Sequence, residues 1–414
     1  MNRYWKPFLI SIRGIRQRTS KTPRSEKTKT AEWLNDATTF ADTHAVILDP
    51  YTSLPYPDKD IKNFLEESEA ASKAAIKERI AKKHIKKKIH RLNFDHIPIE
   101  NQVFILFPGQ GSQFVGMGKK ILDCKRSEEM FDKASSILGY DLKKLCLEGP
   151  KTKLDQTIYC QPAVFVTSLA ALEKAREKDV DLVNRVTETA GFSVGEYSSL
   201  VLAGVISFED ALKIVNVRAK AMHDCNQLIA SGMLTVRVSA SSRLDEAMKE
   251  AKKVAREKNE REICDVANYL YCGLKVIGAS ETCIHYLTEH QEEYRFQVIK
   301  RLPVSGAFHT YLMKDAAEPL KGALKGIVLS PPRINVYSNY TGKLHGRRAG
   351  EIRENLIKQL YSPVKWEQIM QLMYRQHQDN KFPTFAEIGP GRQLGAMLLR
   401  VSKKAYGNYE NHAV

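Results

Sequence analysis

The stretch Glu188–Leu200, ETAGFSVGEYSSL, contains the pattern Gly-x-Ser-x-Gly centred on Ser193. It follows a short β-branched run at 186–190 and precedes an apolar helical pattern, which predicts a strand, a sharp turn and a helix. Such a turn exposes and aims a serine hydroxyl, which is otherwise a weak nucleophile. Gly191 and Gly195 lack the Cβ atoms that would collide where the chain doubles back. The pattern also occurs by chance, and its position between strand and helix favours a nucleophile.

The fold class follows from the alternation of short apolar runs with helical patterns. VFILF at 103–107 and FAEIGPG at 385–391 read as a strand and as a strand followed by a turn. Together with the strand at 186–190, they predict an α/β fold with a mainly parallel, hydrolase-like sheet. Residues 234–303 instead show the order β-α-β-β-α-β, which is typical of a ferredoxin-like subdomain. We expect a large subdomain at 101–233 and 301–405, with the small one inserted at 234–300.

The composition is that of a globular protein, and its charge leaves two interpretations open. It has 414 residues, 43% hydrophobic and 27% charged, with a formal net charge of +16. No apolar run approaches the roughly 18 residues of a membrane helix, which argues against stable membrane insertion. The positive charge favours phosphates or an acidic protein as partners, although a surface tuned for solubility is the alternative. The lack of any recognition motif argues against nucleic acid.

The cysteines predict neither a metal site nor a disulfide framework. The chain has no Cys-x-x-Cys pair, and no histidine joins the cysteines at the spacing of zinc ligands. We expect buried thiols in a reducing compartment. The seven are Cys124, Cys146, Cys160, Cys225, Cys264, Cys272 and Cys283.

The N-terminal 100 residues differ from the rest. Residues 1–25 hold seven Arg or Lys and no Asp or Glu, which predicts a mitochondrial transit peptide and a matrix location, with a basic tail as the alternative. Residues 26–60 are polar and predict a linker. Residues 61–100 predict a basic helical extension, because isoleucines recur near helical spacing among lysines. Those isoleucines are Ile76, Ile80, Ile85 and Ile89.

A nucleophilic serine needs a base and groups that bind an oxyanion. His309, in LPVSGAFHTYLM, stands between an extended apolar segment and a helical stretch, although a capping or core histidine fits the same pattern. The backbone N–H of Val194 follows the serine, and the turn FPGQGSQ offers a second N–H at Gln110. That turn matches neither Gly-x-Gly-x-x-Gly nor the phosphate loop, which argues against a nucleotide site.

Six motifs in order resemble those of malonyl-CoA:acyl carrier protein transacylases, especially the mitochondrial type. The resemblance covers roughly residues 100–405. The motifs are FPGQGSQ at 107–113, GFSVGEYSSLVLAG at 191–204, VRAKAM at 217–222, LPVSGAFHT at 302–310, QLYSPVKWE at 359–367 and EIGPGRQLG at 387–395.

The resemblance implies a ping-pong reaction that supplies mitochondrial fatty acid synthesis. Ser193 would carry malonyl between malonyl-CoA and the phosphopantetheine thiol of acyl carrier protein. His309 would act first as base and then as acid, and the N–H groups of Gln110 and Val194 would bind the oxyanion. No metal or bound cofactor is implied.

The resemblance also implies roles for residues around the nucleophile. Arg218 would pair with the malonyl carboxylate, because a planar guanidinium can donate two parallel hydrogen bonds. The backbone carbonyl of Gln359 would orient the histidine. Phe308 would exclude a branched acyl group, and Met222 and Asn268 would help to shape the acyl pocket.

The sequence departs from many relatives at two places. Phe192 replaces a histidine before the nucleophile, and the segment around Asn268 lacks a second asparagine and a proline common in bacterial relatives. Two other functions stay open. A serine thioesterase or hydrolase acting on acyl-CoA would use the same Ser–His pair, and a non-catalytic, RNA-associated relative would keep only the fold.

Overall fold

The computed structural model describes residues 91–304 and 306–414. The predicted transit peptide and linker, and residues 61–90 of the predicted basic extension, lie outside this part of the chain. Residues 91–98 contain no helix or strand, and η1 (Ile99–Asn101) is a short 3₁₀ helix. The described end of the extension is therefore not an α-helix.

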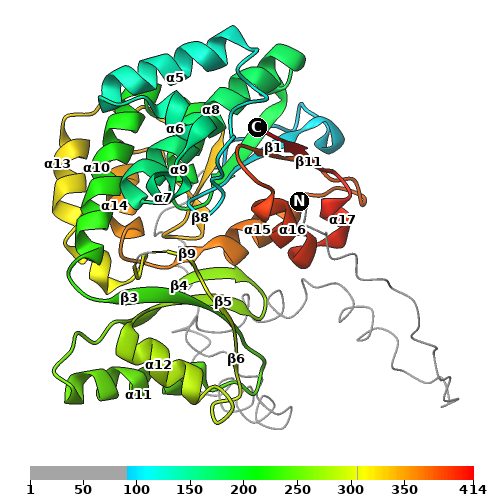
Figure 1. Ribbon diagram of the computed structural model, residues 1–414. Coiled ribbons are helices and arrows are strands. Elements are labelled where there is room, and N and C mark those ends of the chain that lie inside the picture. Colours follow the sequence, from blue (N-terminus) through cyan, green and yellow to red (C-terminus); the bar gives the residue numbers. More distant parts are fainter. Residues whose placement is uncertain (1–90, 305) are drawn as a thin grey trace, which may run out of the picture. The chain divides into compact units, whose positions relative to one another are not determined.

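The larger of two sheets has six strands in the order β11-β10-β1-β2-β7-β8 (Figure 1). All neighbours are parallel except the pair β7–β8. This confirms the predicted α/β fold with a mainly parallel sheet. The strands are β1 (Val103–Phe107), β2 (Val186–Gly191), β7 (Asn335–Ser338), β8 (Lys343–Leu344), β10 (Thr384–Ile388) and β11 (Tyr409–His412).

Strand β1 shows why this sheet is buried on both faces. Val103, Ile105 and Phe107 belong to one hydrophobic cluster, and Phe104 and Leu106 belong to another. Because side chains alternate along a strand, a continuous apolar run serves two cores at once.

Helices supply the partners for both faces. The first cluster includes side chains of α8 and α10, and the second includes side chains of α15 and α16. The helices of this part are α5 (Lys125–Leu138), α6 (Leu142–Glu148), α7 (Lys151–Leu154), α8 (Thr157–Lys178), α9 (Gly195–Leu202), α10 (Phe208–Asn226), α13 (Ala317–Lys325), α14 (Ala349–Gln359), α15 (Trp366–Tyr374), α16 (Gln393–Val401) and α17 (Lys403–Tyr406), with 3₁₀ helices η2 (Val183–Arg185) and η3 (Tyr311–Lys314).

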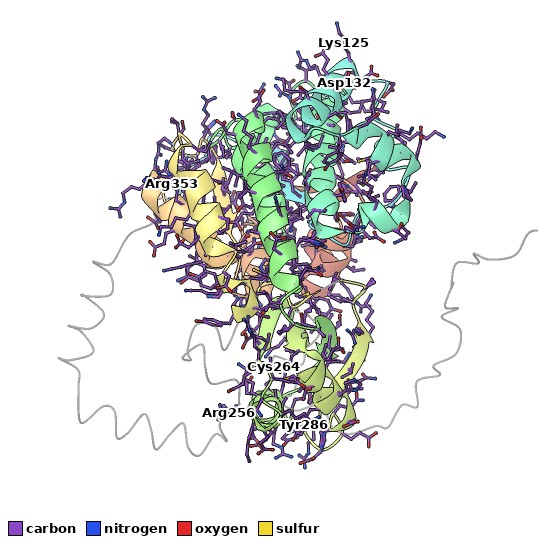
Figure 2. All side chains as sticks on the ribbon, turned by 60° about the vertical axis from the view of Figure 1, so that its left-hand side comes forward. Lys125, Asp132, Arg256, Cys264, Tyr286 and Arg353 are labelled. Atoms are coloured by element: carbon purple, nitrogen blue, oxygen red, sulfur yellow. The ribbon has the colours of Figure 1, made fainter. Side chains whose placement is uncertain are left out.

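The second sheet has the order β6-β3-β5-β4-β9, and its first four strands are antiparallel. Four strands and two helices follow one another as β-α-β-β-α-β, which confirms the ferredoxin-like subdomain. Cys264 on β4, Arg256 on α11 and Tyr286 on α12 mark it in Figure 2. The elements are β3 (Ser231–Arg237), α11 (Leu244–Glu257), β4 (Cys264–Tyr271), β5 (Leu274–Ser280), α12 (Glu281–Glu289) and β6 (Gln297–Arg301).

Four strands were not expected from the sequence: β7, β8, β9 and β11. β11 (409–412) lies beyond residue 405, and its polar sequence YENH is that of a partly exposed edge strand. β9 (Val364–Lys365) has two residues and adds a fifth, parallel strand beside β4. Neither has the apolar alternation on which strand prediction depends.

All seven cysteines lie in the described residues, and all are free thiols. Six are buried as expected, but Cys272 is exposed, because it occupies the tight turn between β4 and β5. None of the helices in residues 91–304 and 306–414 combines the length and hydropathy that crossing a bilayer requires.

Candidate active site

Ser193 lies on a tight turn between the end of β2 at Gly191 and the start of α9 at Gly195. Its φ is 53°, in the left-handed region that costs a non-glycine residue about 1–3 kcal/mol. A Cβ atom on Gly191 would overlap the backbone of Gly195, and one on Gly195 would overlap the carbonyl oxygen of Phe107. Only glycine fits at these two positions, so the pattern in the sequence reflects the packing of the turn.

His309 lies against the serine. Its Nε2 is 2.7 Å from Ser193 Oγ, and its Nδ1 is 2.8 Å from the backbone oxygen of Gln359. Since a carbonyl oxygen only accepts, Nδ1 carries the proton and Nε2 is left as the acceptor. Burial, and then the charge of Arg218, lower the pKa of the His309 imidazole to about 3, although the bond to Gln359 opposes them. The neutral imidazole can therefore accept the serine proton near neutral pH.

Arg218 places a cation beside the nucleophile. Its side chain is fully buried on α10, and its Nη2 donates to Ser193 Oγ at 3.0 Å. The other acceptors are amide oxygens, of Gln359 at 2.9 Å and of Gln161 at 2.5 Å. Within the described part of the chain, no carboxylate forms an ion pair with it. Burial lowers the pKa of Arg218, and neighbouring Tyr197 and Glu196 oppose that shift.

Two backbone N–H groups flank the turn. The N–H of Phe192 donates to the oxygen of Phe107 at 2.9 Å, which holds the loop after β1 beside the serine. Gln110 lies on that loop, and Val194 follows the serine. Among residues 91–304 and 306–414, neither N–H has a hydrogen-bond acceptor. Two unused donors beside a nucleophile are what an oxyanion requires.

The expected pocket residues are buried but differ in their contacts. Phe308 precedes the histidine. Met222 lies one helical turn after Arg218, and its Sδ is 3.5 Å from Gln161 Nε2. Asn268 lies on β4, and its Oδ1 has no hydrogen-bond partner in the described chain. The structure thus brings Met222 to the arginine's neighbour, but no hydrogen bond joins Asn268 to the serine, histidine or arginine.

Phe192 turns to an aromatic neighbour. Its ring packs edge-on against Trp366, with centroids 5.4 Å apart and an interplanar angle of 62°. The substitution of histidine by phenylalanine therefore adds apolar packing under the turn.

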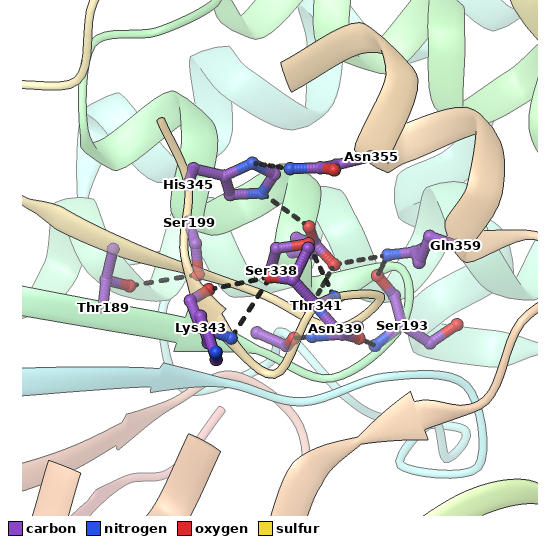
Figure 3. Close-up of polar contacts among 12 residues, drawn as sticks. Thr189, Ser193, Ser199, Ser338, Asn339, Thr341, Lys343, His345, Asn355 and Gln359 are labelled. Carbon is purple, nitrogen blue, oxygen red and sulfur yellow. Dashed lines mark hydrogen bonds and ion pairs between the residues drawn. The ribbon is translucent and has the colours of Figure 1, made fainter. Parts of the chain in front are cut away.

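Sequence reasoning missed the side chains that hold the turn (Figure 3). Asn339 Oδ1 accepts from the N–H of Ser193 at 2.6 Å, and its Nδ2 donates to the oxygen of Gly191 at 2.8 Å. The side chain of Gln359 donates to the oxygen of Ser193 at 3.0 Å. Asn339 is 146 residues from the serine, and no motif spacing indicated it. Gln161, which holds Arg218, was missed for the same reason.

The comparisons with known proteins agree with this geometry. The model of the acyl transferase domain matches residues 103–411. The mitochondrial malonyl-CoA-acyl carrier protein transacylase of Homo sapiens is 42% identical over 306 residues, 74% of this chain and 78% of the human protein. The mouse (Mus musculus) protein of the same name is 38% identical over 359 residues, 86% of this chain and 90% of its own.

Solved structures give the same result. A malonyl-CoA:acyl carrier protein transacylase from Xanthomonas oryzae superposes with a TM-score of 0.67 at 30% identity, covering 77% of this chain and 96% of its own. A malonyl-transacylase solved in complex with a type II polyketide synthase acyl carrier protein has a TM-score of 0.64 at 30% identity, covering 76% and 96%. The chain therefore belongs to the acyl transferase family, and within it to the malonyl-CoA:acyl carrier protein transacylases.

Proposed function

We propose that the protein moves malonyl from malonyl-CoA to the phosphopantetheine thiol of an acyl carrier protein, through an ester on Ser193. One observation carries this proposal: a fully buried guanidinium, with no carboxylate partner in the described chain, donates to the nucleophile's Oγ. A site that only cleaved neutral acyl thioesters would gain nothing from this cation. A three-carbon diacid has a carboxylate at the right end to pair with it.

The first half-reaction forms the ester. Ser193 Oγ attacks the thioester carbonyl while its proton passes to His309 Nε2. The N–H groups of Gln110 and Val194 hold the oxyanion, and the backbone oxygen of Gln359 keeps the proton on Nδ1. The C–S bond then breaks, and His309 protonates the leaving coenzyme A thiolate.

The second half-reaction reverses these steps with another thiol. The phosphopantetheine thiol gives its proton to His309 and attacks the ester carbonyl, and Ser193 Oγ leaves and takes the proton back. Arg218 holds the malonyl carboxylate throughout, in place of one of its present amide acceptors. The burial of Ser193, which is 8% exposed, limits the access of water to the ester.

Selectivity within this reaction is assigned to the neighbouring side chains. Phe308 next to the histidine limits branching beside the carbonyl, and Met222 and Asn268 complete the pocket. Steric filters of this kind discriminate by about 1–3 kcal/mol. Arg218 adds a preference for acyl groups that carry a carboxylate, such as malonyl, over neutral ones, such as acetyl.

The human and mouse relatives named above are mitochondrial proteins, which supports a mitochondrial location and a role in fatty acid synthesis there. The composition of residues 1–25 supports a transit peptide. After the transit peptide, the proposed parts of the chain are a linker at 26–60, a basic extension at 61–100, a large subdomain at 101–233 and 301–405, and a small subdomain at 234–300.

Product analysis separates this function from hydrolysis. Purified protein is incubated with malonyl-CoA and phosphopantetheinylated acyl carrier protein, and malonyl carrier protein and free malonate are quantified. We expect transfer to dominate. Free malonate as the main product, with carrier protein present, would assign a thioesterase instead.

A further inference from the structure

An acid–imidazole pair, Glu196 and His345, lies close to the serine turn and takes no part in the proposed steps. Both side chains are fully buried, and His345 Nε2 is 2.7 Å from Glu196 Oε1. His345 Nδ1 lies 3.4 Å from the amide nitrogen of Asn355 (Figure 3). An amide nitrogen only donates, so Nδ1 accepts from Asn355. The proton of the imidazole is therefore on Nε2, which donates a hydrogen bond to the carboxylate of Glu196.

The other oxygen of Glu196 holds both residues that hold the serine. Oε2 accepts from the backbone N–H of Asn339 at 3.0 Å and from Gln359 Nε2 at 2.7 Å. Asn339 in turn binds the N–H of Ser193, and Gln359 binds its carbonyl oxygen. The carboxylate of Glu196 thus reaches the N–H of Ser193 through Asn339 and the carbonyl oxygen of Ser193 through Gln359.

Gln359 extends this network to the rest of the site. Its backbone oxygen binds His309, and its side-chain oxygen accepts from Arg218. A displacement of Gln359 would therefore move the base, the cation and the nucleophile together. A strained backbone persists only where its surroundings over-determine it, and a buried carboxylate is stable only with donors around it.

We infer that Glu196 and His345 are positioning residues: the carboxylate fixes Asn339 and Gln359, and the imidazole fixes the carboxylate. This rests on the proposed function, because the geometry that they maintain is that of acyl transfer to Ser193. Neither residue touches the acyl group. Their contribution belongs to the rate of ester formation with either acyl donor, and it reaches the choice of donor only through the hydrogen bond between Gln359 and Arg218.

The experiment measures single-turnover ester formation in the full chain by rapid quench, with malonyl-CoA and with acetyl-CoA. Rate constant and burst amplitude are recorded separately. Glu196→Leu removes all three acceptor contacts, whereas Glu196→Gln keeps an oxygen for Asn339 and Gln359. His345→Leu removes the donor to Glu196, and His345→Gln keeps an N–H in its place.

Glu196→Leu should lower the rate constant about 100-fold, the scale expected when a reacting group is misplaced by about 1 Å. His345→Leu should lower it about tenfold, the factor that corresponds to the loss of one hydrogen bond to the carboxylate. The Gln variants should recover most of the loss. Both donors should lose rate, malonyl-CoA at least as much as acetyl-CoA because Gln359 also holds Arg218, and the amplitude should remain near one ester per chain.

Glu188→Gln is the matched control. Glu188 is a fully buried carboxylate on β2 that accepts from the hydroxyl of Tyr337 at 2.8 Å. In the described chain it makes no hydrogen bond with Ser193, Asn339 or Gln359. This variant should keep the wild-type rate constant, whatever it does to the melting temperature.

Two results would overturn the inference: a wild-type rate constant in Glu196→Leu, or a loss confined to the amplitude, which would show a role in folding alone. If Glu196→Leu does not fold, the two His345 variants decide by the same criteria. Failure of the wild-type protein to form a malonyl ester would instead refute the proposed function.

Discussion

At the scale of single residues, the site depends on two residues with a strained backbone and on one buried cation. Ser193 and His309 have φ values of 53° and 60°, yet they approach to 2.7 Å. Each strained conformation costs about 1–3 kcal/mol, which the hydrogen bonds of Asn339 and Gln359 offset. The cost places the hydroxyl and the imidazole in contact before substrate arrives, so little reorganisation is left to the reaction.

Arg218→Met should remove the preference for malonyl. Losing one partner of a buried charge pair costs about 2–5 kcal/mol, so kcat/KM for malonyl-CoA should fall by about 30- to 5,000-fold. The value for acetyl-CoA, which has no carboxylate, should fall far less. Steady-state kinetics with both donors measures the ratio. An unchanged ratio would show that another residue holds the carboxylate.

The acid limb of ester formation should lie well below pH 6.5. His309 has a pKa of about 3 in the folded protein, so it remains neutral where an ordinary histidine would be protonated. An ordinary histidine would lose about 30-fold in rate by pH 5. Rapid-quench rates from pH 5 to 8 test this, and a limb near 6.5 would contradict it. In Arg218→Met, assayed with acetyl-CoA, the limb should move to higher pH.

The same shift contributes to stability. The pKa of His309 in the folded protein lies below the unfolded value near 6.5, so protonation at low pH favours the unfolded chain. The contribution of His309 to the free energy of unfolding is therefore complete above pH 6.5 and is lost as the pH falls from 6.5 towards 3.

At the scale of elements, the strand–turn–helix unit around Ser193 allows no Cβ at its two glycines. Gly191→Ala should therefore lower the melting temperature sharply or prevent folding, because the added atom overlaps the backbone of Gly195. Gly322→Ala on α13 is the control. A Cβ there meets nothing within 4 Å, and alanine should stabilise the helix by up to about 1 kcal/mol. Similar melting temperatures for both variants would refute this account.

The same unit shows what sequence can predict. The clash that requires glycine at 191 comes from Gly195 and Glu196, so the spacing of the motif carries this part of the turn, whereas the clash that requires glycine at 195 comes from Phe107 and Pro108 after β1. Asn339 and Glu196 act on the serine through a contact that spans 143 residues, which no local pattern encodes. Polar β2 was predictable as a strand, but the partners of its buried polar side chains were not. For example, the buried hydroxyl of Thr187 on β2 donates to the side-chain oxygen of Gln102 at 2.9 Å.

At the scale of the whole molecule, two sheets of different topology were predictable because each has its own order of elements. The edges were not. β11 is polar and β9 has two residues, so neither has a strand pattern of its own. Each forms a strand because it pairs with a neighbouring strand, β10 or β4, in the folded protein. The sequence motifs located Ser193, His309 and Arg218, which come from three separate segments. The structure brings His309 and Arg218 within hydrogen-bond distance of Ser193 Oγ.

The net charge of the full sequence is +16, and it remains +9 when the seven Arg or Lys of residues 1–25 are left out, so encounter with an acidic carrier protein should be accelerated. Raising salt from about 50 to about 500 mM shortens the Debye length severalfold, so kcat/KM for carrier protein should fall several-fold with kcat unchanged. Free pantetheine, a neutral acceptor, is the control and should change little. Equal salt dependence for both acceptors would exclude electrostatic steering.

The most direct measurement is intact-protein mass spectrometry after brief exposure to malonyl-CoA. The wild-type chain should gain the mass of one malonyl group, located at Ser193 by peptide mapping and lost when phosphopantetheinylated carrier protein is added. Ser193→Ala should gain none. A malonyl adduct of equal yield on Ser193→Ala would contradict the account.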